Sequence, residues 1–165
     1  MTTLRRLAWD NLPFMLGFAL LAVFCSQRHA GFMMVLTALP VLLYCLTRLG
    51  IGWRSTDQRR HYLFAIAVVL AASAVVGAAH GYHHFSARAE ADQLLRRVLD
   101  FRAQQGRFPG NAAELGEPAP PVRSKNMLHY SFQDGEPALF YAATFIVFDT
   151  WLYDFSTQAW VYRPD

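Results

Sequence analysis

The sequence predicts a membrane α-helical region of three transmembrane helices followed by an α+β domain, in which a long helix packs on a three- or four-stranded antiparallel sheet. Three observations lead to this fold class. Of the 165 residues, 54% are hydrophobic and 16% are charged, which is too apolar for an ordinary soluble domain. The first half of the chain gathers its apolar residues into three long runs. The last 40 or so residues instead form short runs rich in aromatic residues and separated by turn signals, which is typical of strands.

Charge is unevenly distributed along the chain. Residues 1–85 carry seven basic and two acidic side chains, whereas residues 86–165 carry eight basic and ten acidic ones. The basic excess therefore belongs to the short segments beside the apolar runs. For this reason the net charge of +3 does not indicate nucleic-acid binding.

The three apolar runs cover about residues 7–26, 30–49 and 62–82. A bilayer core about 30 Å thick is crossed by roughly 20 apolar helical residues, so each run predicts a transmembrane helix. The uncharged part of the first run begins only at Asn11, which makes it the shortest. The second run contains Pro40, where we expect a kink, and the third has no charge.

Basic residues predict the orientation of these helices. Arginines precede the first run and cluster between the second and third, and such segments remain in the cytoplasm. The cytoplasmic arginines are Arg5, Arg6, Arg48, Arg54, Arg59 and Arg60. Aromatic residues stand where interfacial belts belong, at Trp9, Trp53, Tyr62 and Tyr82. We therefore expect a multi-pass protein of the bacterial inner (cytoplasmic) membrane with a cytoplasmic N-terminus and a periplasmic C-terminal domain.

Small residues recur on one side of the third predicted helix. Ser73, Gly77 and Gly81 are spaced four residues apart, a pattern that lets helices approach closely in lipid. We expect this side to pack against the first two helices, and a homodimer formed through it is the sharper alternative.

The periplasmic domain is predicted to cover residues 83–165, after a transmembrane region of residues 1–82. Residues 83–105 form an amphipathic helix that ends at Gly106 and continues the third apolar run, so that residues 62–105 are one helix. Residues 106–126 contain four prolines and predict a loop. Residues 127–163 predict the antiparallel sheet, with Asp134-Gly135 as a hairpin signal and with Tyr130 and Phe132 on the opposite side from His129.

The segment GRFPGNAAELG follows the long helix and precedes the sheet. In this order of parts, residues 62–165 resemble the type IV pilin and pseudopilin fold, whose long helix is followed by a Gly-x-Phe-Pro segment and then a leucine. The matching residues are Gly106, Phe108, Pro109 and Leu115. The third apolar run lacks the prepilin cleavage site and the glutamate that follows it in pilins. The resemblance therefore implies the fold and not the filament-forming function.

Three histidines, His80, His83 and His84, follow the third apolar run. His80 and His84 are four residues apart on one helix side, a spacing that could hold zinc or copper. A position in the lipid headgroup region explains the same residues without a metal. Cys25 and Cys45 lie inside apolar runs and predict no disulfide, and no motif of an enzyme is present. We expect no cofactor and no catalytic residue.

The C-terminal strands are crowded with aromatic residues. One helix covers only one face of a sheet, so several of these rings are expected on the other face. They either complete the core of a small domain or form an exposed patch that binds a protein partner. The candidate partner-binding residues are Trp151, Tyr153, Trp160 and Tyr162. We expect a non-catalytic inner-membrane protein, either an accessory subunit of an envelope assembly or an immunity protein that binds a toxin. The alternative is a membrane protein that binds metal through the three histidines.

Overall fold

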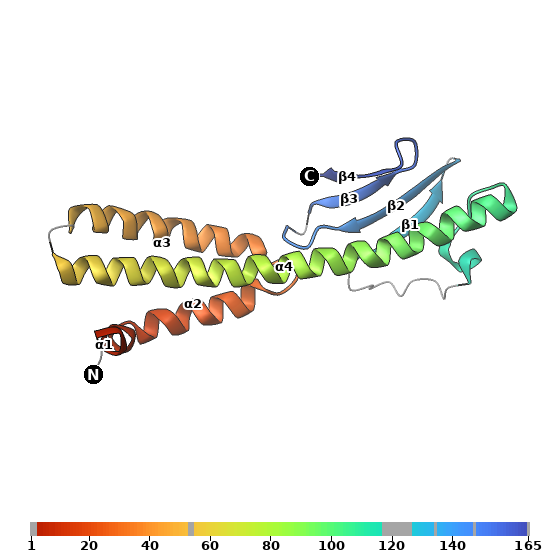
Figure 1. Ribbon diagram of the computed structural model, residues 1–165. Coiled ribbons are helices and arrows are strands. Elements are labelled where there is room, and N and C mark those ends of the chain that lie inside the picture. Colours follow the sequence, from red (N-terminus) through yellow and green to blue (C-terminus); the bar gives the residue numbers. More distant parts are fainter. Residues whose placement is uncertain (1–2, 53–54, 117–126, 134, 147, 165) are drawn as a thin grey trace. The chain divides into compact units, whose positions relative to one another are not determined.

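A computed structural model describes residues 3–52, 55–116, 127–133, 135–146 and 148–164 of the chain (Figure 1). The chain forms two compact units, Met1–Gly81 and Tyr82–Asp165, here called the helical region and the C-terminal domain. The predictions made for Trp53, Arg54 and Asp134, and for the prolines at 118, 120 and 121, lie outside the described residues.

Four α-helices follow one another: α1 (Thr3–Asp10), α2 (Leu12–Cys25), α3 (Gly31–Ile51) and α4 (Thr56–Gln105). The 50 residues of α4 are helical without interruption. This confirms the prediction that the third apolar run and the amphipathic segment are one helix, although the helix begins six residues earlier than Tyr62. Helix α4 ends at Gly106, whose positive φ of 69° is a conformation that favours glycine.

Only two helices, α3 and α4, are long and apolar enough to cross a membrane, so the prediction of three is wrong for the described residues. The first apolar run is broken at Asn11, where φ is −108° and ψ is 11°, and α2 restarts with Pro13 in its first turn. The 14 residues of α2 span only about 21 Å at 1.5 Å per residue. That length falls short of the roughly 30 Å core of a bilayer.

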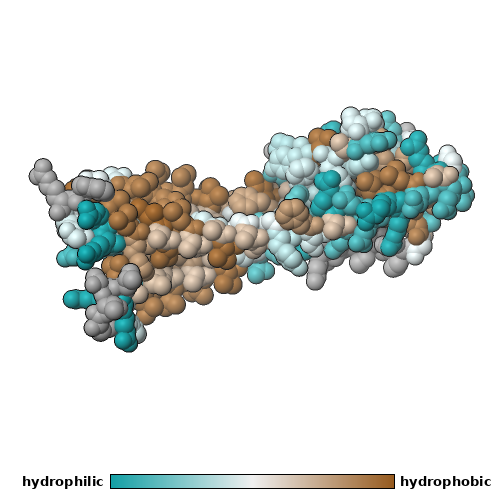
Figure 2. Space-filling view, viewed as in Figure 1, coloured by the Kyte–Doolittle hydropathy of each residue, from teal (hydrophilic) through white to brown (hydrophobic). Residues whose placement is uncertain are grey.

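The helical region has a narrow core and an apolar exterior. Phe18 and Cys25 of α2, Met34 of α3, and Val69 and Val76 of α4 pack together as a buried cluster. In the most apolar 18-residue stretch of α3, only 17% of the residues are buried, and the same holds for α4. Many other apolar side chains of these helices are exposed, and Figure 2 shows a largely brown surface over this region.

His80 is buried in this region although its side chain can ionise. Its Nε2 lies 2.8 Å from the carbonyl oxygen of Cys25, the last residue of α2. The last carbonyls of a helix have no partner within the helix, so this contact satisfies one of them and ties α4 to the end of α2.

The C-terminal domain is an α+β unit built on the second part of α4. Strands β1 (His129–Gln133), β2 (Glu136–Ala142), β3 (Thr150–Asp154) and β4 (Ala159–Arg163) form one antiparallel sheet in the order β1-β2-β3-β4. A short 3₁₀ helix, η1 (Ala112–Leu115), lies between α4 and β1. The four-stranded meander confirms the predicted sheet. The long helix packed on it makes the architecture pilin-like.

The core of this domain lies between α4 and one face of the sheet. Ala87, Ala91, Leu95 and Val98 of α4 are buried, at the helical spacing that the sequence predicts. From the sheet, the large buried side chains are Tyr130, Leu139, Tyr141 and Tyr153. Small alanines on the helix leave space for the large rings of the sheet.

We expect Leu139→Ala to lower the free energy of unfolding of the C-terminal domain by about 2–5 kcal/mol, because Leu139 is fully buried and its removal leaves a cavity. Leu152→Ala on the other face of the same sheet is the matched control and should cost about 1 kcal/mol. Urea unfolding of the full chain in mild detergent, followed by tryptophan fluorescence, measures both. Equal losses would show that the two faces are covered alike.

Candidate functional site

The register of the sheet gives each face a fixed set of side chains. Tyr130, Leu139, Tyr153 and Trp160 stand opposite one another in the four strands. Since three of them are buried with Leu95 and Val98 of α4, this row belongs to the face that α4 covers, here called the inner face. The next row across the strands belongs to the opposite side, here called the outer face. It consists of His129, Phe140, Leu152 and Val161.

All four predicted partner-binding residues lie on the inner face. Tyr153 is buried, and Trp151 and Trp160 are half-buried. Tyr162 is 44% exposed, and its hydroxyl donates a hydrogen bond to Asp149. These four rings form two contacting pairs, Tyr153 with Trp160 and Trp151 with Tyr162, and the ring centroids of each pair are 5.3 Å apart. Most of their surface therefore serves the core of the domain, and only Tyr162 offers a large exposed part to a partner.

A polar stripe on α4 faces the same rings. His84, Arg88 and Asp92 are each four residues apart and so share one side of the helix. Arg88 Nε donates to both carboxylate oxygens of Asp92, at 3.1 and 3.2 Å. The indole Nε1 of Trp160 donates to the same carboxylate at 2.9 Å, and the Arg88 guanidinium lies 4.8 Å from the Trp160 ring centroid. Asp92 therefore joins α4 to the last strand of the sheet.

His84 stands at the end of this stripe and contacts aromatic rings. Its ring centroid lies 5.3 Å from that of Trp151 and 6.2 Å from that of Tyr141. Burial lowers the pKa of His84, and the positive charge of Arg88 lowers it further. The fold therefore favours the neutral imidazole.

Tyr141 is the largest fully buried side chain of the described residues. Its ring packs 5.2 Å from that of Trp160, and its hydroxyl has no hydrogen-bond partner within the described part of the chain. Burial raises the pKa of this hydroxyl, which keeps the group neutral. In this position Tyr141 fills the space over Ala87 and Ala91.

The residues that carry the pilin resemblance close the other end of the core. Phe108 and Leu115 pack against the buried cluster, and the Tyr130 hydroxyl donates to the Pro109 carbonyl at 2.8 Å. Burial raises the pKa of Tyr130 to about 12, with a smaller contribution from Glu114. This segment therefore turns the chain back onto the sheet after α4 ends. Its contacts are structural.

The histidine cluster is divided between different contacts. Nε2 of His80 lies beside the carbonyl oxygen of Cys25, whereas His84 lies among the rings of the inner face and His83 lies next to Tyr82. In the parts of the chain that the structure describes, no three side chains of His, Cys, Asp or Glu come together as a metal site would require. The metal-binding alternative stays a prediction.

Among the described residues, the small-residue side of α4 is open at its two glycines. Gly77 and Gly81 have no heavy atom within 4 Å of the place where a Cβ would stand. The Ser73 hydroxyl donates to the carbonyl of Val69 in its own helix. These residues therefore do not provide close packing against α2 or α3, and homodimerisation stays a prediction.

The outer face is the candidate binding surface. No described helix or strand of the C-terminal domain covers it, and its row of side chains crosses all four strands, with an apolar residue on β2, β3 and β4 and His129 on β1. The half-buried Phe140 and Leu152 and the exposed Val161 form the row, with the His129 ring 5.0 Å from that of Phe140. A groove of about 780 Å³ is lined by Ala138, Leu152 and Val161 of this face. At the end of the sheet it is also lined by Glu136, Arg163 and, from α4, Arg102.

Turns hold the outer face in place. Asp154 Oδ1 accepts hydrogen bonds from the Ser156 amide at 2.8 Å, the Ser156 hydroxyl at 2.6 Å and the Thr157 amide at 3.3 Å. These bonds lower the pKa of Asp154 to about 2, so the carboxylate keeps its negative charge. The same bonds stabilise the turn between β3 and β4. No motif in the sequence marks this face as a binding surface. The alternation of strand residues could have revealed it once the face covered by the helix was known.

Comparisons of this chain with protein-family models, with curated proteins and with solved structures find no match.

We expect Asp92→Ala to lower the free energy of unfolding by about 1–2 kcal/mol, because the Trp160 indole and the Arg88 guanidinium both lose their acceptor. Asp92→Asn keeps an acceptor oxygen and should lose less. Asp100→Ala, an exposed acid on the same helix, should change the free energy by about 0.5 kcal/mol or less. If Asp100→Ala lowers the free energy of unfolding as much as Asp92→Ala does, Asp92 has no special role in linking α4 to β4.

We expect the C-terminal domain to lose stability as the pH falls below about 6.5. The pKa of His84 is lowered in the fold, so in this range the unfolded chain binds more protons than the folded one. The stabilisation is complete at higher pH and is lost on acidification. His84→Phe keeps a ring beside Tyr141 and Trp151 and should weaken this pH dependence, whereas His129→Phe on the outer face should not. Melting temperatures measured in mild detergent across this pH range test both variants.

Proposed function

We propose that this protein is a non-catalytic, membrane-anchored binding protein of the bacterial inner membrane, and that its C-terminal domain holds a protein partner on the outer face of its sheet. The observation that carries this proposal is the apolar row across the four strands, which nothing within the described domain covers. Apolar side chains gathered on an open surface are typical of protein contacts.

The helical region supports the membrane anchor. Helices α3 and α4 are long enough to cross a bilayer, and only 17% of the most apolar stretch of each helix is buried. The core helix of a soluble protein would bury such a stretch. A lipid environment removes the exposed apolar surface from water, which accounts for this arrangement.

Orientation follows from the arginines. Arg48, Arg59 and Arg60 stand near the end of α3 and the beginning of α4, and short segments rich in basic residues remain cytoplasmic. The other end of the apolar stretch of α4 then lies on the periplasmic side, and the C-terminal domain with it. Helix α2 is too short to cross the bilayer as a third transmembrane helix. We propose that it packs on α3 and α4 and enters the bilayer only in part.

Polar side chains of the C-terminal domain support a binding role over a catalytic one. Asp92 accepts from Arg88 and Trp160, Asp154 caps a turn, and Glu114 pairs with Arg107. These groups are used in contacts that hold the fold, and only Asp154 of these three acids lines the groove of the outer face. The partner fits one of two classes, a component of an envelope assembly or a toxin that the protein neutralises.

The test is photo-crosslinking of the full-length protein in membranes of the cells that make it. A photoreactive residue at Leu152 or Val161 on the outer face should give one discrete protein adduct. The same residue at Leu99, an exposed position of α4, is the matched control and should give none.

A second substitution makes the result specific. With the photoreactive residue at Leu152, Val161→Asp should abolish the adduct without lowering the melting temperature, because Val161 is exposed. Absence of any protein adduct from Phe140, Leu152 and Val161 would contradict the proposal. If the adduct forms only when a toxin is supplied, the partner is a toxin, whereas an adduct in unchallenged cells indicates an envelope assembly.

A further inference from the structure

The connection between β2 and β3 is unusually apolar for a loop. Residues 143–149 read ATFIVFD, whereas loops on a protein surface are normally polar. The Ala143 amide donates to the Asp149 carbonyl at 2.8 Å, which closes the base of the loop. Phe148 is 67% exposed, so at least this ring finds no place in the core of its own domain.

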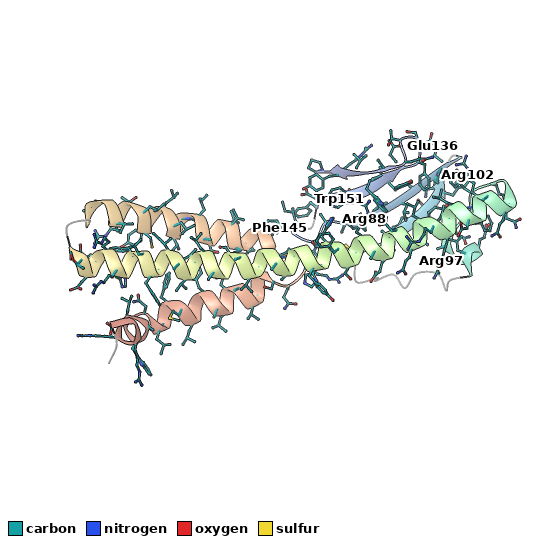
Figure 3. The ribbon with its side chains drawn as sticks, viewed as in Figure 1. Arg88, Arg97, Arg102, Glu136, Phe145 and Trp151 are labelled. Atoms are coloured by element: carbon teal, nitrogen blue, oxygen red, sulfur yellow. The ribbon has the colours of Figure 1, made fainter. Side chains whose placement is uncertain are left out.

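Contacts within the C-terminal domain give the position of this loop along α4. Tyr141, near the end of β2, and Trp151, near the start of β3, both lie beside the ring of His84. Figure 3 shows Phe145 and Trp151 at the same end of the domain as Arg88, while Glu136 and Arg102 lie at the opposite end. The loop is thus at the end of the domain where α4 enters it.

Two further exposed aromatic residues lie on α4 at this end. Tyr82 is 73% exposed and Phe85 is 74% exposed, on the sides of the helix that the sheet does not cover. They follow directly after the uncharged stretch from Tyr62 to Gly81. At 1.5 Å per residue, Phe85 is only about 6 Å along the axis from Gly81.

We propose that Tyr82, Phe85 and Phe148 form an aromatic belt that seats the C-terminal domain on the surface of the lipid bilayer. The inference rests on the membrane anchor of the proposed function. Since α4 is one uninterrupted helix, the surface of a bilayer that holds its uncharged stretch lies within about a turn of Tyr82.

A lipid surface fits this belt better than a protein partner does. Tyr82 and Phe85 lie on α4 where it enters the domain, and the loop that carries Phe148 lies at the same end. A planar surface at that end of the domain would meet all three rings. Aromatic rings at this level match the interfacial belts of membrane proteins. A protein partner would instead need a patch on one side of the domain.

The experiment uses the full chain, with the buried Cys25 and Cys45 replaced by alanine, in vesicles of phosphatidylcholine with a minority of phosphatidylglycerol. A spin label is attached at Phe148→Cys. A matched label at Thr157→Cys reports the exposed turn at the far end of the sheet. Collision with oxygen, which concentrates in lipid, is compared with collision with a water-soluble nickel complex.

We expect oxygen to relax the label at position 148 more strongly than the nickel complex does, with the opposite order at position 157. If both labels favour nickel, the loop is in water and the proposal is wrong. If the label at 148 is shielded from both reagents, a protein contact covers it and the proposal is also wrong.

A third label separates this inference from the membrane anchor. Leu70→Cys lies in the middle of the uncharged stretch and is exposed on the helix. Lipid exposure at position 70 with water exposure at 148 would overturn the belt alone. Water exposure at position 70 would overturn the membrane anchor and the belt with it.

Discussion

The packing of α4 against one face of a four-stranded sheet is the interaction on which the C-terminal domain depends. Alanines on the helix, Ala87 and Ala91, let it approach the sheet, and the large rings of Tyr141 and Tyr153 fill the space beside them. A single helix covers a single sheet face, and the described domain has no second layer for the other. The open outer face is therefore a direct consequence of this packing, and a binding role follows from it more naturally than from any arrangement of polar groups.

Continuity of α4 is the second constraint, because the same helix serves two different surroundings. Its uncharged part carries apolar side chains on all sides, while its last part is amphipathic and carries the stripe His84, Arg88 and Asp92. No glycine or proline interrupts it where the pattern changes, except Gly81, which stays helical. One helical backbone therefore runs from the helical region into the C-terminal domain without a break.

Sequence patterns predicted much of this fold because they reflect local rules. The long helix, its end at Gly106 and the opposite placement of His129 and Tyr130 all follow from periodicity and from turn residues. The break at Asn11 could not be predicted from hydropathy, because hydropathy is averaged over a whole run. One polar residue followed by Pro13 hardly changes that average. The alternation of side chains along a strand does not show which face of the sheet α4 covers. The sequence therefore could not predict that α4 covers the face with Trp151, Tyr153, Trp160 and Tyr162. The bond from Trp160 to Asp92 joins residues 68 apart in the chain, and no local pattern encodes it.

The two proposed surfaces are compatible because they occupy different parts of the sheet. The belt residue Phe148 lies beyond the ends of β2 and β3, whereas the apolar row from His129 to Val161 crosses the middle of the strands. Lipid contact at one end of the strands leaves the outer face available to a protein. An apolar open face is a hazard for a freely diffusing domain, since two such faces can associate. A protein partner bound to the outer face, as proposed, would remove this hazard, because the apolar side chains of that face would no longer be open.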